Sequence, residues 1–183
     1  MAKVKMKNQL QLLLILMLLT ACKVPVIKQQ EHGQYYPIAQ NAWIEIQQKA
    51  RIEPDNARAY FQDGKWIHPS SLNLYEVNCE LEVRDVVEKY QWINPGKFEI
   101  IRTQQDQSPI VFGPGKSTTL AWNQDQAPSD IKRFWKFTLQ SKQQANVMHF
   151  ICRGVQDSPY NATLPTSTEM QTAVGQHIKL HLF

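Results

Sequence analysis

The feature that most constrains the fold is an alternation of apolar and polar side chains with a period of two residues. It is clearest between residues 75 and 86, where the apolar members are Val77, Cys79, Leu81 and Val83. Successive side chains of a strand point to opposite faces of a sheet, so this spacing indicates a strand with one buried face. A helix would repeat its apolar residues every three to four positions instead.

The same alternation recurs along the chain. Apolar residues at even positions between 44 and 52 are followed by the turn residues Pro54-Asp55-Asn56 and by a second alternating segment over 57–62. We therefore expect these two segments to form a hairpin. Shorter β-rich segments predict further strands over 97–102 and 177–183 and a second hairpin from 134–140 and 146–153.

One short helix is well marked. Thr166 and Glu169 have the spacing of a capping box, and Gly175 supplies a stop signal, so the helix should span 167–174. About eight short strands and one helix near the C-terminus predict an all-β fold, either an antiparallel sandwich or a small barrel. The length of 183 residues, of which 43% are hydrophobic, is enough for a single β-rich domain over 38–183.

Charge argues against binding of nucleic acids. The chain has 20 Lys and Arg against 16 Asp and Glu, but Lys3, Lys5 and Lys7 lie in the first 21 residues, which contain no acidic residue. The remaining chain is close to neutral and lacks the clustered basic residues that phosphate-backbone binding needs.

The first 21 residues form a segment of their own. Residues 1–9 hold three lysines, residues 10–19 are apolar except for Gln11, and two small residues then precede Cys22. A basic start, an apolar stretch and small residues at a cut site are typical of a secretory signal. The apolar stretch is too short for a permanent transmembrane helix, which takes roughly 20 residues.

The segment Leu19-Thr20-Ala21-Cys22 resembles the lipobox of bacterial lipoproteins. This resemblance implies that a signal peptide of residues 1–21 is removed and that Cys22 receives a diacylglyceryl group and a further acyl chain such as palmitate. Two or three chains hold a protein firmly on a bilayer, whereas one chain holds only marginally. An ordinary secretory signal with a cysteine at the cut site is the alternative.

The resemblance also implies a location. In this class an aspartate after the lipidated cysteine favours retention in the inner membrane, but here Lys23 follows. We therefore expect an envelope protein on the outer rather than the inner membrane, facing the periplasm or the cell surface and attached through Cys22. Residues 22–37, with two prolines, a glycine and no periodicity, should act as a flexible tether.

Two further cysteines should form a disulfide. Once Cys22 is lipidated, Cys79 and Cys152 remain, and an even pair in an exported domain is expected to oxidise. Both lie on the apolar faces of predicted strands, so we expect the thiols to point inward and to meet across the core. Two unpaired thiols or a redox-active pair are the alternatives, although the CxxC spacing of redox pairs is absent.

The residues that could bind a nucleotide or a metal, or take part in catalysis, lack the patterns that these functions require. The segment 113–117 resembles the end of a phosphate-binding loop, but Ile110 stands where that motif needs a glycine, so a turn is expected and no nucleotide. His177 and His181 alternate with apolar residues on a predicted strand, which separates their rings by roughly 13 Å and leaves them in solvent. Met148, His149 and Cys152 have the residue types of a copper site but not its spacing.

Other side chains are expected to be structural. Glu80 and Glu82 should lie in solvent on the outer face of their strand. Trp43 and Trp66 lie near strand or turn edges, where an aromatic ring can stack on a sugar or mark an interface, but packing at the core or an edge is the main expectation.

These observations predict a non-catalytic domain that binds another envelope protein or helps to assemble a complex. No catalytic residue, metal ligand or cofactor is predicted. Two alternatives stay open. The first is a carrier, in which a barrel holds a lipid or another small apolar ligand. The second is an envelope enzyme of unknown class, in which acidic, histidine or serine side chains converge in a cleft.

Overall fold

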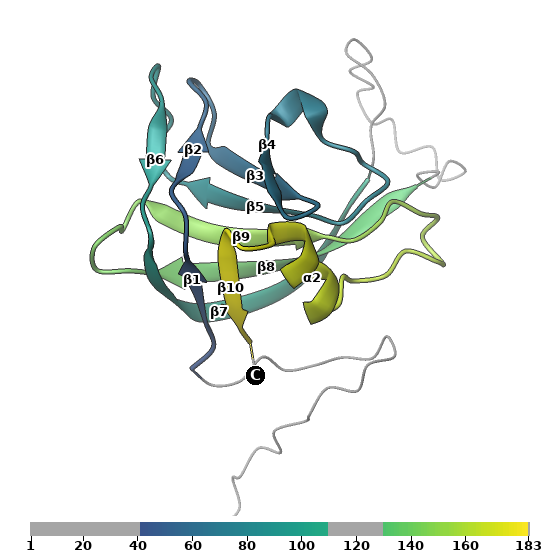
Figure 1. Ribbon diagram of the computed structural model, residues 1–183. Coiled ribbons are helices and arrows are strands. Elements are labelled where there is room, and N and C mark those ends of the chain that lie inside the picture. The colour runs from purple at the N-terminus through teal and green to yellow at the C-terminus, as the bar shows by residue number, and fades with distance from the viewer. Residues whose placement is uncertain (1–40, 110–129, 183) are drawn as a thin grey trace, which may run out of the picture.

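The computed structural model describes residues 41–109 and 130–182. These residues form a strongly curled, antiparallel sheet of eight strands, in the shape of a half-barrel, with one helix on its concave side (Figure 1). The order of the strands is β10-β1-β7-β8-β9-β5-β3-β4. Their bounds are β1 (Trp43–Ile46), β3 (Arg58–Gln62), β4 (Lys65–Ile67), β5 (Asn78–Val83), β7 (Gly96–Pro109), β8 (Ile131–Gln140), β9 (Val147–Arg153) and β10 (Ile178–His181). The predicted all-β fold is confirmed.

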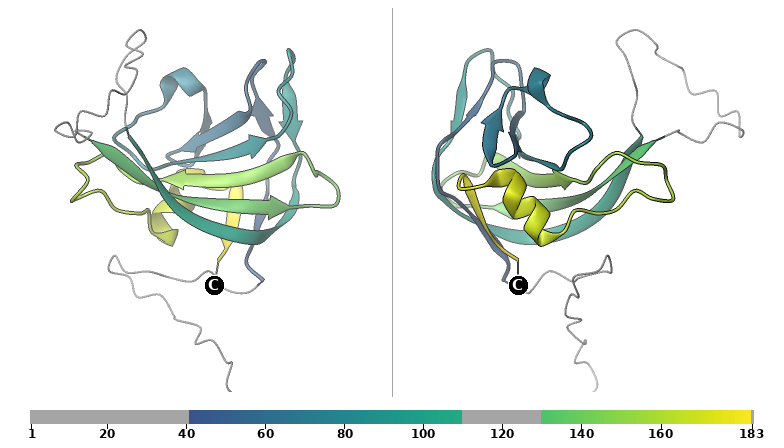
Figure 2. Two further views of the ribbon diagram at one scale, coloured as in Figure 1. Left: turned by 180° about the vertical axis from the view of Figure 1, so that it is seen from behind. Right: turned by 45° about the vertical axis from the view of Figure 1, so that its right-hand side comes forward.

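Two further strands, β2 (Ala50–Ile52) and β6 (Gln91–Ile93), pair only with each other in the described part of the chain. Because β1 leads into β2 and β6 leads into β7, this pair continues the β1–β7 pair beyond an irregular step (Figures 1 and 2). We call the β2–β6 pair, together with the loop from β5 to β6 (residues 84–90), the arm.

The expected hairpin of residues 44–52 with 57–62 is wrong. The first segment is two strands, neither of which pairs with β3; β3 pairs with β4 and β5 instead. The sequence signal for the real hairpin is Asp63-Gly64, a two-residue turn in which both residues have positive φ angles of 51° and 73°. The Pro54-Asp55-Asn56 turn is instead bonded to the arm, since the Asp55 amide donates to the Val87 carbonyl at 2.9 Å.

The helix has the predicted limits. Helix α2 (Ser167–Val174) begins with the complete capping box, in which the Glu169 amide donates to Thr166 Oγ1 and the Thr166 amide donates to Glu169 Oε2, at 3.2 and 2.7 Å. It ends at Gly175 and buries Met170, Ala173 and Val174. A short 3₁₀ helix, η1 (Pro69–Ser71), follows β4.

The core lies on the concave side of the curled sheet. The alternating apolar residues that predict the strands are buried there, and the large side chains Phe61, Phe98, Phe137 and Phe150 are fully buried. The rings of Phe137 and Phe150 stack with centroids 5.8 Å apart. The concave side is therefore filled by side chains and by α2.

The predicted disulfide is confirmed, but its geometry differs from the expectation. Cys79 on β5 and Cys152 on β9 are directly opposite residues of neighbouring strands, with Cα atoms 4.1 Å apart. The bond therefore links two strands of one sheet side by side and does not cross the core. The alternation of apolar and polar residues predicts the face on which each cysteine lies. It does not predict which strands are neighbours, so the side-by-side geometry of the disulfide could not be predicted.

Glutamine side chains complete hydrogen bonds that no strand provides. The Gln171 amide lies along the outer edge of β10, donating to the Ile178 carbonyl at 2.9 Å and accepting from the Leu180 amide at 3.0 Å. Gln62 makes the same two-bond contact with the backbone of Asn73, at 2.8 and 2.9 Å. A carboxamide has one donor side and one acceptor side, as a peptide group does, and so substitutes for a strand residue.

Candidate interaction surface

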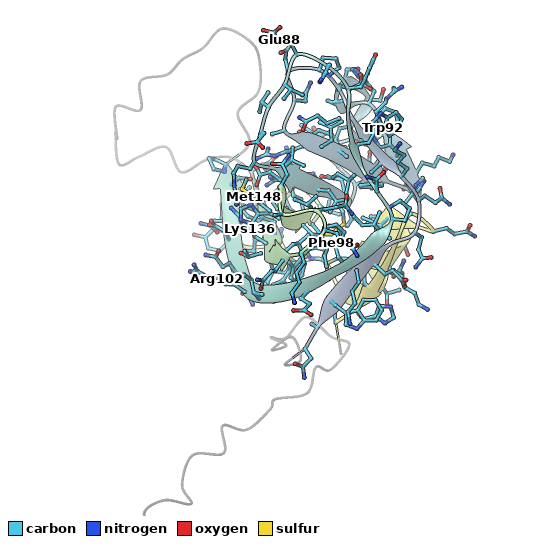
Figure 3. All side chains as sticks on the ribbon, turned by 90° about the vertical axis from the view of Figure 1, so that its left-hand side faces the viewer. Glu88, Trp92, Phe98, Arg102, Lys136 and Met148 are labelled. Atoms are coloured by element: carbon cyan, nitrogen blue, oxygen red, sulfur yellow. A yellow bond between two sulfur atoms is a disulfide. The ribbon has the colours of Figure 1, made fainter. Side chains whose placement is uncertain are left out.

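The arm has one buried and one exposed face. Ala50, Ile52 and Ile93 face inward and belong to the core. The opposite face carries Lys49 and Arg51 beside Tyr90, which directly precedes β6, and Trp92 of β6. Tyr90 and Trp92 are 54% and 48% exposed, and Figure 3 shows Trp92 on the flank of the arm.

Cations and aromatic rings interleave on this outer face. Lys49 Nζ lies 4.7 Å from the centroid of the Trp92 ring. The Arg51 guanidinium lies 4.8 Å from the Trp66 ring and 5.0 Å from the Tyr90 ring. Arg51 is directly opposite Trp92 in the register, so its contact with Tyr90 is a diagonal one across the strand pair. These contacts are cation–π interactions at an exposed site.

Arg51 is held in place by several groups. The Trp66 indole N–H donates to the Arg51 carbonyl at 2.8 Å, and the guanidinium pairs with Glu53 Oε1 at 2.8 Å. Trp66 packs against the core as well, so the structure supports a packing role for this indole. Arg51 and Trp66 thus form a fixed base for the more exposed rings of Tyr90 and Trp92.

The turn between β8 and β9 fixes the arm to the main sheet. Gln144 Nε2 donates to the Asn94 carbonyl at 2.9 Å, and Gln144 Oε1 accepts from the Asn94 amide at 2.8 Å. Asn146 Oδ1 also accepts from the Asp85 amide at 3.1 Å. The bend between β6 and β7 therefore has its backbone groups satisfied, and the aromatic face is held at a defined angle.

The chemistry of this face suits recognition rather than catalysis. Trp, Tyr and Arg are enriched in the centres of protein interfaces because they bury much area at little entropic cost. The face has no histidine, cysteine or serine among the residues named, and Glu53 is already paired with Arg51.

A network of charges lies on the convex face of the main sheet. Glu80 is only 2% exposed, and its Oε1 lies 2.8 Å from Arg153 and 3.5 Å from Arg58. Glu82 accepts from Arg58 at 2.7 Å and bonds His149 Nδ1 at 2.8 Å. The expectation that both glutamates lie in solvent is wrong: the face is correct, but basic residues on β3 and β9 cover them.

These charges alter one another's titration. Burial alone would lower the pKa of Arg58, but Glu80 and Glu82 outweigh it and raise that pKa above its ordinary value. Burial raises the pKa of Tyr60, with Glu80 adding to the effect. Burial, and then the charge of Arg153, lower the pKa of Lys132 to about 8. Since every glutamate of the network is occupied by arginine or histidine, the arrangement is that of a structural ion-pair network.

The histidines of the last strand are not free in solvent, contrary to expectation. The ring of His181 stacks on Trp43 with centroids 3.6 Å apart and an angle of 11°. His177 precedes β10 and packs against Phe61 at 5.6 Å, and burial lowers its pKa. Trp43 lies on β1, the neighbour of β10, whereas Phe61 lies on β3, far from β10 in the strand order.

Trp43 has a packing role. Lys97 Nζ lies 4.3 Å from its ring centroid, and His181 stacks on it from the strand on the other side of β1. An indole with such neighbours offers no open face for a sugar. Sequence reasoning singled out Trp43 and Trp66 but missed Trp92 and Tyr90, the exposed pair. Their period-two spacing was a signal for one shared face, although not for an exposed one.

The remaining predicted sites are accounted for as follows. Cys22, the segment 113–117 and the tether lie outside the described residues. Cys152 is disulfide-bonded and His149 is bonded to Glu82, so neither is free to join Met148 at a metal. Within residues 41–109 and 130–182, no three His, Cys, Asp or Glu residues are grouped as a metal site would require. In the same residues, no helix has the length and apolar character needed to cross a membrane.

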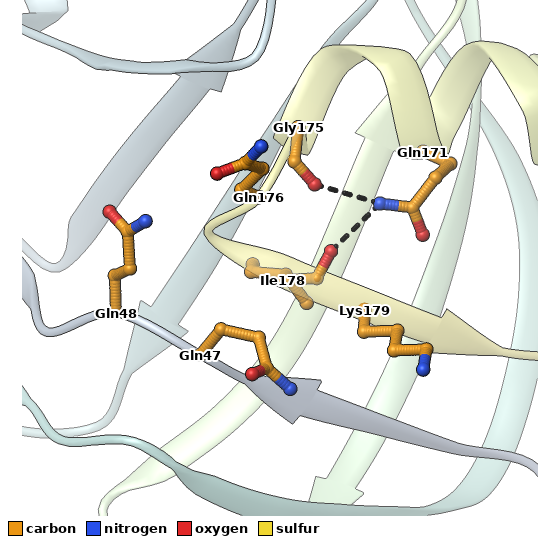
Figure 4. A pocket seen from close by; sticks show the side chains of 7 residues that line it. All are labelled: Gln47, Gln48, Gln171, Gly175, Gln176, Ile178 and Lys179. Atoms are coloured by element: carbon orange, nitrogen blue, oxygen red, sulfur yellow. Dashed lines mark hydrogen bonds between the residues drawn. The ribbon is translucent and has the colours of Figure 1, made fainter.

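A polar hollow lies beside the C-terminus of α2 (Figure 4). Its lining consists of Gln47, Gln48, Gln171, Gly175, Gln176, Ile178 and Lys179. Gln171 is committed to backbone hydrogen bonds. The lining contains no carboxylate, hydroxyl, thiol or imidazole group, and its polar character does not suit an apolar ligand.

Fold and surface together define a curled antiparallel half-barrel with a projecting aromatic arm. No protein-family model, curated protein or solved structure matches the chain.

Proposed function

We propose that the protein is a lipid-anchored, non-catalytic binding module of the bacterial envelope, which recognises a partner protein through the outer face of the arm. The observation that carries the proposal is the exposed pair Tyr90 and Trp92, interleaved with Lys49 and Arg51 on a rigidly held strand pair. The anchor is proposed from the lipobox-like segment that ends at Cys22.

The energetics of recognition favour such a face. Binding costs the ordering of mobile side chains, and preorganised groups reduce that cost. Arg51 is fixed by Trp66 and Glu53, and the arm is fixed by Gln144. A partner that covers the two rings would bury apolar area and meet the positive groups of Lys49 and Arg51, so its contact surface should carry carboxylates beside apolar side chains.

The carrier and enzyme alternatives have less support. A carrier needs an apolar space on the concave side, where fully buried phenylalanines and α2 are packed. An enzyme needs converging reactive groups, whereas the carboxylates of Glu80 and Glu82 on the convex face are paired with arginines. No specific observation favours either of them.

The binding role is tested by capturing partners from detergent-solubilised membranes with the full chain at its native expression level. We expect Trp92→Ala combined with Tyr90→Ala to lose a partner that the unaltered chain recovers reproducibly. The matched control is Tyr160→Ala, because Tyr160 is 98% exposed and lies outside the arm. If the double variant and the control recover the same partner equally, the arm is not the binding face.

The anchor is tested separately by membrane fractionation of Cys22→Ala. The unaltered chain should sediment with the outer membrane and take up labelled palmitate, and the variant should do neither. Recovery of the unaltered chain in the soluble fraction with an unmodified Cys22 would contradict the proposed membrane attachment. It would not test whether the arm binds a partner.

A further inference from the structure

Strand β7 has a long edge without a strand partner in the described part of the chain. On one side β8 pairs with β7 from Glu99 to Pro109. On the other side β1 pairs only with residues 96–99. Figure 2 shows β7 running on past the end of β1. Residues 101–109 therefore present a row of backbone donors and acceptors on the β1 side.

Two features border this edge without interrupting it. The register shifts around Ile101, which is 58% exposed, and Pro109 ends the strand. Bulges and prolines are common protections against edge-to-edge pairing. Here both stand at the ends, and the residues from Arg102 to Ser108 between them form regular pairs with β8. No described strand pairs with the β1 side of this stretch of seven residues, which is roughly 24 Å long.

The side chains on the convex face of this stretch are self-complementary. Arg102, Gln104 and Asp106 face the same way, because they are opposite Thr138, Lys136 and Phe134 on β8. Arg102 and Asp106 are exposed, and neither has an ion-pair partner among the described residues. A positive group, a neutral amide and a negative group therefore stand at equal spacing along the edge.

We propose that β7 pairs antiparallel with β7 of a second copy of this chain, with Gln104 opposite Gln104 on the two-fold axis. In this register Arg102 of each copy is directly opposite Asp106 of the other, so that two ion pairs form at once. Directly opposite residues of an antiparallel pair share a face and interact. The contact is isologous and closes as a dimer, which joins the two curled sheets into one.

The charge pattern favours a second copy over a different protein. An unrelated strand would need its own acidic and basic residues in matching positions, whereas this edge matches itself by sequence alone. The edge lies on β7 beyond β1, and the arm joins β7 at the opposite end of that strand. The dimer proposal is therefore independent of the proposed partner-binding role.

Charge reversal tests the register. The full chain is purified in detergent and its dissociation constant is measured by sedimentation equilibrium. Arg102→Asp and Asp106→Arg each place like charges opposite one another twice, and each should raise the dimer dissociation constant by about tenfold or more. The double variant Arg102→Asp with Asp106→Arg restores both pairs and should return the constant to near the original value.

Mixing the two single variants gives a sharper result. A chain with Arg102→Asp and a chain with Asp106→Arg are complementary to each other but not to themselves, so an equimolar mixture should form heterodimers. A chain that stays monomeric at tens of micromolar overturns the proposal. A dimer that neither single reversal weakens also overturns the proposal, because its interface then lies elsewhere and the edge of β7 binds another occupant or none.

Cross-linking tests the axis in cells that express the full chain. Gln104→Cys should yield a disulfide-linked dimer on a non-reducing gel, since the two sulfurs would face each other. Lys136→Cys is the matched control: Lys136 shares the convex face one strand further in, so its two copies lie roughly three strand spacings, or about 14 Å, apart. Figure 3 labels Lys136 and Arg102 on this side of the molecule. Equal cross-linking of both variants, or none at position 104, contradicts the register.

Discussion

Glu82 illustrates how single residues of the convex face depend on their neighbours. Burial alone would raise its pKa, but hydrogen bonds from Arg58 and His149 outweigh burial and hold the pKa below its ordinary value. The folded state therefore prefers the ionised carboxylate more strongly than the unfolded chain does. The stability that follows is present above the ordinary pKa and is lost as the pH falls through the lower, folded-state value.

We expect this residue to contribute to acid sensitivity. The free energy of unfolding should fall as the pH drops below about 4.5 in the unaltered chain, and the fall should be smaller in Glu82→Gln, which has no carboxylate to protonate there. Urea unfolding at a series of pH values measures this difference. Glu99→Gln is the control, because Glu99 is exposed and has no ion pair among the described residues. Parallel pH curves for the unaltered chain and Glu82→Gln would refute the assignment.

Gln144 gives a second prediction at the scale of one side chain. Gln144→Glu keeps the acceptor for the Asn94 amide but replaces the donor with a carboxylate oxygen that faces the Asn94 carbonyl. Loss of one hydrogen bond and the new repulsion should lower the free energy of unfolding by about 1–3 kcal/mol.

The control lies in the same turn. Gln143→Glu makes the same chemical change at an exposed residue for which no side-chain hydrogen bond exists within the described residues, and it should alter stability by less than about 0.5 kcal/mol. Proteolysis of the arm should also quicken in Gln144→Glu only. Equal effects of the two variants would mean that the Gln144 contact does not hold the bend.

At the scale of elements, the C-terminal end of α2 contacts the β3–β4 turn through two glycines, Gly175 and Gly64. A Cβ atom on Gly175 would lie 2.5 Å from Gly64 Cα and 2.7 Å from the Gly64 carbonyl oxygen, and Gly175 has a φ of 55°. The Gly64 amide donates to the Ala173 carbonyl at 3.1 Å. The helix can therefore cover the concave side only because Gly175 has no side chain at this point.

Gly175→Ala should accordingly destabilise the fold by more than about 2 kcal/mol, since both the steric overlap with backbone and the positive φ oppose a side chain. The next residue gives the control: Gln176 is exposed, and Gln176→Ala should change stability by less than about 0.5 kcal/mol. Thermal unfolding followed by near-UV circular dichroism compares the two. A Gly175→Ala protein as stable as the control would show that the turn moves aside without cost.

At the scale of the whole molecule, the Cys79–Cys152 bond joins two neighbouring strands and closes a long loop of the chain that contains β6, β7 and β8. The two cysteines are separated by 73 residues, and linking them stabilises the fold by about 4 kcal/mol in the chain-entropy description. The bond joins β5 to β9 and so ties the half of the sheet that contains β3 and β4 to the half that contains β7 and β8.

Reduction should therefore lower the urea midpoint strongly, and the double variant Cys79→Ala with Cys152→Ala should match the reduced chain. Dithiothreitol should leave the double variant unchanged, which controls for effects of the reductant itself. A midpoint that barely moves on complete reduction, verified by thiol titration, would show that the unfolded chain gains little freedom.

The local pattern of residues in the sequence predicts the parts of this fold that local interactions decide. The apolar residues at 44, 46, 50 and 52 are buried, as their alternation predicts, and the capping box and Gly175 mark both ends of α2. The Asp63-Gly64 turn also carries a two-residue hairpin signal, whereas the predicted hairpin has its turn at Pro54-Asp55-Asn56. The second half of β7, residues 103–109, was missed because its side chains are polar on both faces and show no alternation.

The amino-acid sequence by itself determined the strand class, the buried face of most strands, the helix and the identity of the disulfide partners. Those features depend on side-chain periodicity, on capping groups within a few residues of one another, and on the cysteines available. Only the tertiary structure decided which strands are neighbours, and hence the ion pairs of Glu80, the exposed rings of the arm and the open edge of β7. Strand pairing joins residues far apart in the chain, and a period of two specifies a face but never the partner beside it.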